Sequence, residues 1–313
     1  MPGSSRSAAL LRATSAAAGS RWVRFGFLGA AVALAVVTVV DQRVAVLAAL
    51  ERVAPADLVL AGAAAVANLL LAALAWRAVL SGLGSPLPVR AAARVYLVGQ
   101  VGKYLPGGVW NLLAAAELAR DHAVARRQTV ASMLLAVLVS AVTAAGLAAA
   151  LLLDLPWSML APLVLVGLCP PVLNGVIGVV LRITRRDPLP AQLGLRGVGR
   201  AVLWTMASWA AVGAQVAVLA IAAGAPATVA TLSLSTGAYV LAWLVGTAAV
   251  VLPAGAGARE ATLVVVLAPV VGLGAAVAVA LLSRVLVTLA DLLSAGVALF
   301  ATRRWAVGPV TSP

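Results

Sequence analysis

The chain has 313 residues, of which 64% are hydrophobic and only 10% are charged, and its mean hydropathy is +1.11. Soluble domains carry about 25% charged residues, so this composition excludes a soluble globular protein and requires lipid as the solvent for most of the chain. The net charge is +13 at pH 7. Because the arginines lie in short stretches between apolar segments, without interleaved aromatic residues, this charge indicates positive-inside topology and argues against nucleic-acid binding.

Three regions follow one another along the chain. Residues 1–21 are rich in serine, alanine and arginine and are expected to form a flexible cytoplasmic tail. A transmembrane domain is expected over residues 22–302, followed by a short C-terminal tail over residues 303–313. A spanning helix needs about 20 mostly apolar residues. The segments that meet this requirement are Trp22–Val40, Leu58–Leu80, Val130–Leu153, Trp157–Leu181, Val202–Ala223, Thr231–Leu252 and Gly274–Ala301.

The distribution of arginines gives the orientation in the membrane. Four of them lie before or at the start of the first span and place the N-terminus in the cytoplasm, and the mixed, slightly acidic Asp41–Asp57 stretch is then expected to form an outside loop. The four arginines are Arg6, Arg12, Arg21 and Arg24.

Two further apolar segments are too broken to be simple spans. Ala91–Leu118 is interrupted by Lys103 and by Pro106–Gly108, and Pro253–Gly272 opens with a glycine-rich run. Arginines flank the first segment on both sides, so it should enter the membrane from the cytoplasm and return as a re-entrant hairpin. The expected fold is an all-α integral membrane protein, a polytopic bundle of about seven to eight transmembrane helices with two re-entrant or broken helical segments.

The two broken segments share a sequence pattern that suggests an internal repeat. Leu97–Gly99 precedes Leu105–Gly108 with the same spacing as Leu244–Gly246 precedes Leu252–Gly255, and the offset between the prolines is 253 − 106 = 147 residues. Such matches also arise by chance in a chain this rich in leucine, valine and glycine. Paired breaks in two halves are nevertheless the best sequence indication of a transporter's binding site.

The first broken segment carries a candidate anion site. Proline cannot continue a helix, so a new helix is expected from about Val109 to Arg120, with its free N–H groups facing the loop. Lys103 is the sole lysine of the chain, and a charge in an apolar segment is costly unless it is paired, hydrated or functional. Alternatively, Lys103 extends to the membrane surface and the nearby aromatic residues form an interfacial belt. The candidate residues are Gln100, Lys103, Tyr104, Pro106, Gly107, Gly108, Trp110 and Asn111.

The second broken segment repeats this chemistry with an arginine. A proline and glycine break leads into a short apolar helix, expected over Ala261–Leu267. Arg259 offers a planar cation for a phosphate, and Glu260 suits the positive end of the helix dipole. Adjacent helical residues do not face each other, so these two are expected to have different partners. The alternative is an ordinary loop with an arginine that reaches the surface. The candidate residues are Pro253, Gly255, Gly257, Arg259 and Glu260.

The last apolar span contains a polar stripe. Arg284, Thr288 and Asp291 are spaced by four and three residues, which places them on one helical face. Arg284 and Asp291 are roughly 10 Å apart along the axis, so each needs a partner elsewhere. They are candidates for the binding site, and the alternative is a purely structural interaction between helices.

Signatures of an enzyme or a metal site are missing from the sequence. The sole cysteine, Cys169, and the sole histidine, His122, do not make a metal site. We find no Ser/His/Asp set and no nucleotide-binding loop, because the glycine-rich run lacks the Gly-Lys-Ser/Thr ending. We therefore expect no cofactor, no metal and no catalytic residue.

The two motifs and the polar stripe resemble those of the flippase-like membrane family related to the transmembrane region of lysylphosphatidylglycerol synthases. The features that carry the resemblance are Gly102–Trp110, Leu252–Glu260, Ser283-Arg284 and Asp291, and it covers nearly the whole chain after about residue 20. The resemblance implies a scaffold that translocates aminoacylated phosphatidylglycerol between leaflets. Aminoacylation itself belongs to a separate cytosolic domain, which this sequence is expected to lack.

Three functions are compatible with these features. The first is a flippase-like protein of the cell membrane, in which Lys103, Arg259 and Arg284 neutralise an anionic phospholipid or lipid-linked substrate. In that case Glu260 or Asp291 would hold a cationic aminoacyl group where the lipid has one. The second is a membrane-embedded lipid transferase, which would need an essential acid such as Asp41 or Glu260. The third is a non-catalytic partner of a separate lipid-modifying enzyme.

Overall fold

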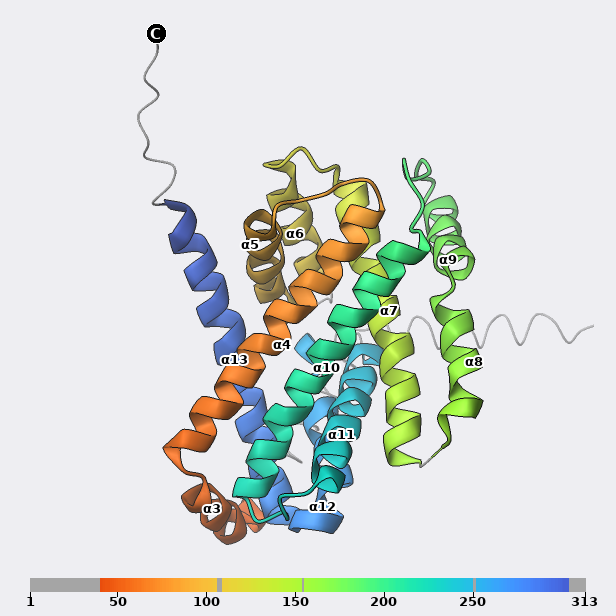
Figure 1. Ribbon diagram of the computed structural model, residues 1–313. Coiled ribbons are helices and arrows are strands. Elements are labelled where there is room, and N and C mark those ends of the chain that lie inside the picture. Colours follow the sequence, from red (N-terminus) through yellow and green to blue (C-terminus); the bar gives the residue numbers. More distant parts are fainter. Residues whose placement is uncertain (1–39, 106–108, 154, 250–251, 304–313) are drawn as a thin grey trace, which may run out of the picture.

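The computed structural model describes residues 40–105, 109–153, 155–249 and 252–303, and within them the chain is all α-helical. Figure 1 shows the helices as one bundle with a peripheral pair, α8 and α9. The α-helices are α3 (Arg43–Arg52), α4 (Pro55–Gly82), α5 (Val89–Gln100), α6 (Trp110–Arg120), α7 (Arg126–Leu152), α8 (Trp157–Leu168), α9 (Pro170–Ile183), α10 (Leu195–Ala222), α11 (Val229–Ala248), α12 (Ala258–Val271) and α13 (Leu273–Arg303), and the short 3₁₀ helices are η1 (Val101–Tyr104) and η2 (Pro253–Gly255).

Five of the described helices are long and apolar enough to cross a membrane, namely α4, α7, α10, α11 and α13. The count rises to six if the bent pair α8 and α9 forms one span. The described residues therefore contain fewer spans than the seven to eight expected. One expected span, Trp22–Val40, lies almost wholly outside the described residues.

The segment Trp157–Leu181, expected as one span, is broken in two. Helix α8 ends at Leu168, α9 begins at Pro170, and the two axes differ by 49°. Pro170 has no N–H to donate and its ring clashes with the preceding turn, so it is accommodated at the first position of a new helix.

The stretch between Asp41 and Asp57, expected as a loop, contains a helix. In α3, Val46 and Ala49 are buried against Val277 and Ala278 of α13. These four residues form a small apolar cluster at one end of the bundle, and this packing accounts for helix α3 in place of the expected loop.

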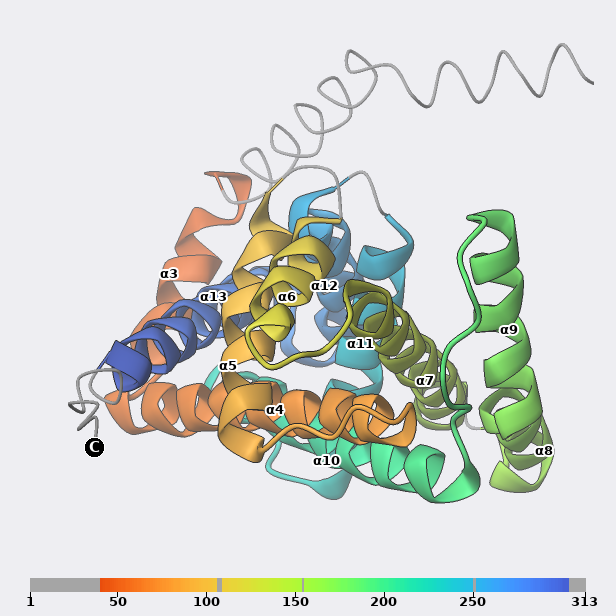
Figure 2. The same ribbon diagram turned by 90° about the horizontal axis from the view of Figure 1, so that it is seen from above.

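Helices α4 and α10 form the centre of the bundle and run in opposite directions along each other (Figures 1 and 2). Small residues allow the two helices to approach closely. For example, a Cβ on Gly82 of α4 would lie 3.5 Å from the Cα of Gly197 of α10. Lipid supplies no hydrophobic drive between helices, so such close van der Waals packing is the main source of association.

Apart from α3, α8 and α9, the described elements form two halves with the same order of elements, and Figure 1 shows that α10 and α13 run opposite to α4 and α7. Helices α4, α5, η1, α6 and α7 in the first half correspond to α10, α11, η2, α12 and α13 in the second. The contacts respect this exchange, because α7 packs on α11 as α13 packs on α5, and α4 packs on α13 as α10 packs on α7. The breaks η1 and η2 contact each other, so both lie at the interface of the halves.

The packing of α10 on α11 depends on a glycine. A Cβ on Gly213 would lie 2.7 Å from the Cβ and 3.0 Å from the Cα of Thr236, and a backbone atom cannot yield as a side chain can. We therefore expect Gly213→Ala to destabilise the protein by about 1–3 kcal/mol, measured as a lower thermal unfolding temperature in detergent. Gly175→Ala is the matched control, because no atom lies within 4 Å of its added Cβ. Equal unfolding temperatures for the two variants would contradict this packing.

Candidate functional site

A cavity of about 450 Å³ lies between the two halves of the bundle. Its wall is built from α4, α5, η1, α6 and α7 of the first half and from α10, α11, η2, α12 and α13 of the second. Among the described residues, Lys103, Arg259 and Asp291 are the charged side chains on this wall. The candidate cations of the two broken segments, 156 residues apart (259 − 103) in sequence, therefore face the same space.

Helix α5 tightens into η1 at its end, and this turn positions Lys103. A Cβ on Gly102 would lie 2.6 Å from the backbone N of Asn111, so only glycine allows the start of α6 to pack so closely on η1. Helix α6 begins at Trp110, close to the expected start. The intervening Pro106, Gly107 and Gly108 lie outside the described residues.

Lys103 is held by a carboxylate from the last helix. Its Nζ lies 2.7 Å from Oδ2 of Asp291, and the hydroxyl of Tyr104 donates to the same oxygen at 2.5 Å. Tyr104 also interacts with Thr288, the middle residue of the polar stripe. The Asp291 side chain is 2% exposed and that of Lys103 is 23% exposed, so the carboxylate is shielded while the ammonium stays accessible to the cavity.

The second break has an unusual backbone. Ala254, Gly255 and Gly257 have φ angles of 49°, 67° and 84°, in the left-handed region that glycine tolerates best. A Cβ on Gly255 would lie 2.7 Å from the Cα of Gly246, so α11 and η2 are in backbone contact. The side chain of Arg259 passes over Gly246 on its way to the cavity, and a larger residue there would collide with it.

Arg259 is oriented by Tyr239, a residue of α11. Its Nη2 donates to the Tyr239 hydroxyl at 2.8 Å, and its guanidinium carbon lies 5.2 Å from the centre of that ring. A neutral phenol fixes the guanidinium without neutralising it, so the remaining donors keep their charge for an anion.

Glu260 has different partners from its neighbour, as the spacing predicts. It accepts a hydrogen bond of 2.6 Å from the backbone N–H of Gly257 at the start of α12. Its other oxygen lies 3.3 Å from Nη1 of Arg284, which also donates to the carbonyl of Ala254 at 3.0 Å. Glu260 and Arg284 thus hold η2 and the start of α12 against α13.

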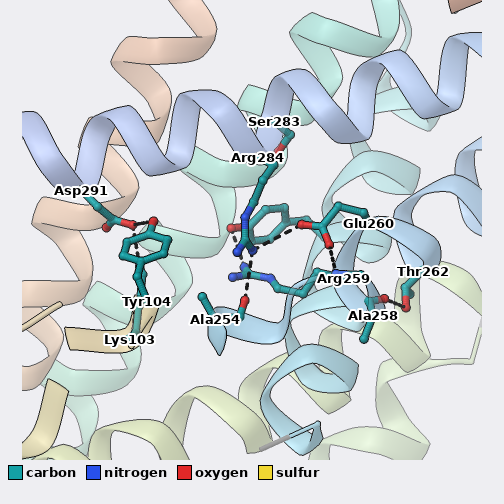
Figure 3. A network of polar contacts seen from close by, with 12 residues as sticks. Lys103, Tyr104, Ala254, Ala258, Arg259, Glu260, Thr262, Ser283, Arg284 and Asp291 are labelled. Carbon is teal, nitrogen blue, oxygen red and sulfur yellow. Dashed lines mark hydrogen bonds and ion pairs between the residues drawn. The ribbon is translucent and has the colours of Figure 1, made fainter. Parts of the chain in front are cut away.

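Figure 3 shows how the polar stripe of α13 connects the two breaks, with Asp291 directed at η1 and Arg284 at η2. The stripe residues do not pair with each other, as their spacing along the helix requires. Across this network the cations Lys103, Arg259 and Arg284 face two carboxylates, Glu260 and Asp291. The network therefore carries one excess positive charge.

Some of the residues predicted from the sequence line the cavity, and others do not. Those on its wall are Gln100, Lys103, Asn111, Gly255, Arg259 and Asp291. Tyr104, Glu260 and Arg284 do not line the cavity, and they hold its wall through the contacts above. Gly257 caps α12, Pro253 lies in η2, and Trp110 is 46% exposed and does not line the cavity.

The aromatic residues of the cavity were not predicted from the sequence. They come from α4, α5, α10 and α11, and they carry no charge or glycine motif that marks them. One signal was available, because Tyr96 and Trp243 are 243 − 96 = 147 residues apart, the offset of the two breaks. The aromatic residues on the wall are Trp76, Tyr96, Trp209, Tyr239 and Trp243.

The ion pair of Lys103 and Asp291 should be strongly coupled. Removing the lysine charge alone leaves a shielded carboxylate without its counter-ion, and removing the carboxylate leaves the ammonium without its counter-ion and on the same wall as Arg259. We expect a coupling of about 1–3 kcal/mol between Lys103→Met and Asp291→Leu in a double-mutant cycle of thermal stability. The double variant should be more stable than either single variant predicts by addition. Strict additivity would contradict a direct pair.

The sequence of the chain matches the family model described as the lysylphosphatidylglycerol synthase TM region over residues 25–295. This match spans both halves of the bundle and both broken segments. No curated protein matches the chain. The family is one of multi-pass membrane domains and is not itself a catalytic domain. The chain belongs to the family of lysylphosphatidylglycerol synthase transmembrane regions.

Proposed function

We propose that this protein binds the phosphate of an anionic lipid in the cavity between its halves and moves the lipid between leaflets of the cell membrane. The observation that carries the proposal is the position of Lys103 and Arg259 on the wall of one cavity, each beside a helix break. A phosphate accepts hydrogen bonds from ammonium and guanidinium groups, and the opposite charges strengthen these bonds. Membership of the family supports a role in lipid handling.

The state of the cations favours an anionic ligand. The excess positive charge of the network would be neutralised by a lipid phosphate. Lys103 already holds one carboxylate oxygen at 2.7 Å, which is the distance of a charge-assisted bond. A phosphate can share or take over this ammonium, while Arg259 supplies a planar pair of donors from the other half.

The proposed movement follows from the arrangement of the halves. Each contributes a broken helix, expected to be re-entrant, and the breaks meet at the interface of the halves. In transporters with inverted repeats, rocking of one half against the other exposes a central site to each side in turn. Such a cycle needs no covalent chemistry. In this arrangement the N-terminus of the protein would lie in the cytoplasm, as the distribution of arginines predicts.

A translocation assay tests this function. The purified protein is reconstituted in vesicles with a fluorescent phosphatidylglycerol, and the fraction accessible to an added quencher is followed over time. We expect Lys103→Gln and Arg259→Gln to slow translocation by tenfold or more, because each loses a charge-assisted bond of about 1.5–3 kcal/mol. Arg200→Gln is the matched control, since Arg200 is exposed at the start of α10 and does not line the cavity.

Rates equal to that of the unaltered protein in both cavity variants would count against the proposal. Mass spectrometry of the vesicle lipids at the end of the assay separates translocation from transferase chemistry. Translocation leaves the same lipid species in a new distribution, and a transferase produces a species of different mass.

A further inference from the structure

We infer that the cavity selects phosphate lipids with a neutral, hydroxyl-bearing head group, such as a polyol or a sugar, over lipids with a cationic aminoacyl group. This inference rests on the proposed phosphate binding and adds the chemical class of the head group. It follows from the neutral polar and aromatic residues that line the cavity beside the cations.

Neutral hydrogen-bonding groups line the cavity from both halves. The side-chain amides of Gln100 and Asn111 flank Lys103 on either side of the first break, and neither is bonded to another group among the described residues. On α4 and α10, the hydroxyl of Ser208 donates to Oδ1 of Asn68 at 2.6 Å and leaves the amide nitrogen of Asn68 free of a protein partner in the described part of the chain. The neutral polar residues on the wall are Asn68, Gln100, Asn111, Ser140, Thr205, Ser208 and Thr247.

Two aromatic pairs, one from each half, complete this wall. Trp76 of α4 lies 5.8 Å from Tyr96 of α5, and Trp209 of α10 lies 5.2 Å from Trp243 of α11, measured between ring centres. Both tryptophans of the central helices are anchored, because the indole N–H of Trp76 donates to Ser132 and that of Trp209 to Thr143 on α7.

Trp76 is fully buried and Trp209 is 5% exposed, so these two rings support the partly exposed rings of Tyr96 and Trp243, which offer apolar faces beside the neutral donors and acceptors. A polyol or sugar carries both kinds of surface, since its C–H groups are apolar and its hydroxyls both donate and accept. Binding pockets for small molecules combine apolar and aromatic walls with a few placed polar groups, and the volume of about 450 Å³ suffices for a phosphate and one such head group.

A cationic head group would lack a counter-ion in this cavity. Asp291 is the carboxylate on the described part of the wall, and its Oδ2 already binds Lys103 and Tyr104. Glu260 does not line the cavity, and it already binds Gly257 and Arg284. An added ammonium would instead meet the like charges of Lys103 and Arg259, which disfavour it in a site of low dielectric.

Binding to the purified protein in phosphatidylcholine nanodiscs, followed by tryptophan fluorescence and native mass spectrometry, tests the selection. The probes are dioctanoyl phosphatidic acid, dioctanoyl phosphatidylglycerol, dioctanoyl lysylphosphatidylglycerol and a short isoprenyl phosphate carrying one glucose. We expect phosphatidylglycerol or the glucosyl lipid to bind about tenfold more tightly than phosphatidic acid, the gain of one or two neutral hydrogen bonds. The lysyl lipid should bind at least tenfold more weakly than phosphatidylglycerol.

The variants Gln100→Leu and Asn111→Leu should reduce the preference for hydroxyl-bearing lipids over phosphatidic acid by about threefold to tenfold. Gln192→Leu is the matched control, because Gln192 is an exposed amide that does not line the cavity. A thermal unfolding curve for each variant separates loss of a contact from loss of the fold.

The outcomes separate the inference from the proposed function. Equal or tighter binding of the lysyl lipid or of phosphatidic acid, with dependence on Lys103 retained, overturns the head-group selection alone. If none of the phosphate lipids shows binding that depends on Lys103, the proposed function is overturned and the inference with it.

Discussion

The contact between the two helix breaks depends on glycines that let backbone lie against backbone. Gly102 brings η1 against the start of α6, and Gly246 brings α11 against η2 and gives Arg259 a path to the cavity. A methyl group at either position would meet atoms that cannot all move away. The breaks then contact each other at the interface of the halves, and each places a cation on the cavity wall. The site is therefore a consequence of close helix packing, which is also what holds a membrane bundle together.

The charges around the cavity differ in how fully they are compensated. Arg284 and Glu260 are bound to each other and to the backbone of the second break, so they serve as fixed supports. Arg259 is oriented by the neutral Tyr239 and keeps its charge, and Lys103 shares its charge with a shielded carboxylate. Burying a charge is tolerable only with a partner, and here the partners differ between the two cations that face the cavity.

Much of the bundle could be predicted from the sequence, because long apolar windows such as those of α4, α7 and α13 are set by the thickness of the bilayer. The break at Pro170 was not predicted, because hydropathy measures the polarity of side chains and does not register the loss of a backbone hydrogen bond at a proline. The cations on the cavity wall were also identified as candidates from the sequence, since a charge in an apolar segment is conspicuous. Their partners were not, because Tyr104 and Asp291 are separated by 187 residues and only the packing of η1 on α13 brings them together.

The two halves share their course but not their side chains, and this asymmetry bears on how a site between them would work. The break of the first half is held to α13 through Asp291, which forms an ion pair with Lys103 and accepts a hydrogen bond from Tyr104. The break of the second half is held to the same helix by Arg284, through a carbonyl and a carboxylate. An anion bound as proposed would compete with Asp291 for Lys103 and so act on the contact of η1 with α13, whereas Arg284 does not line the cavity. In the proposed function, the attachment of the first break to α13 is therefore the one that a ligand would change, while Tyr104 keeps its bond to Asp291 and the second break keeps its contacts with Arg284.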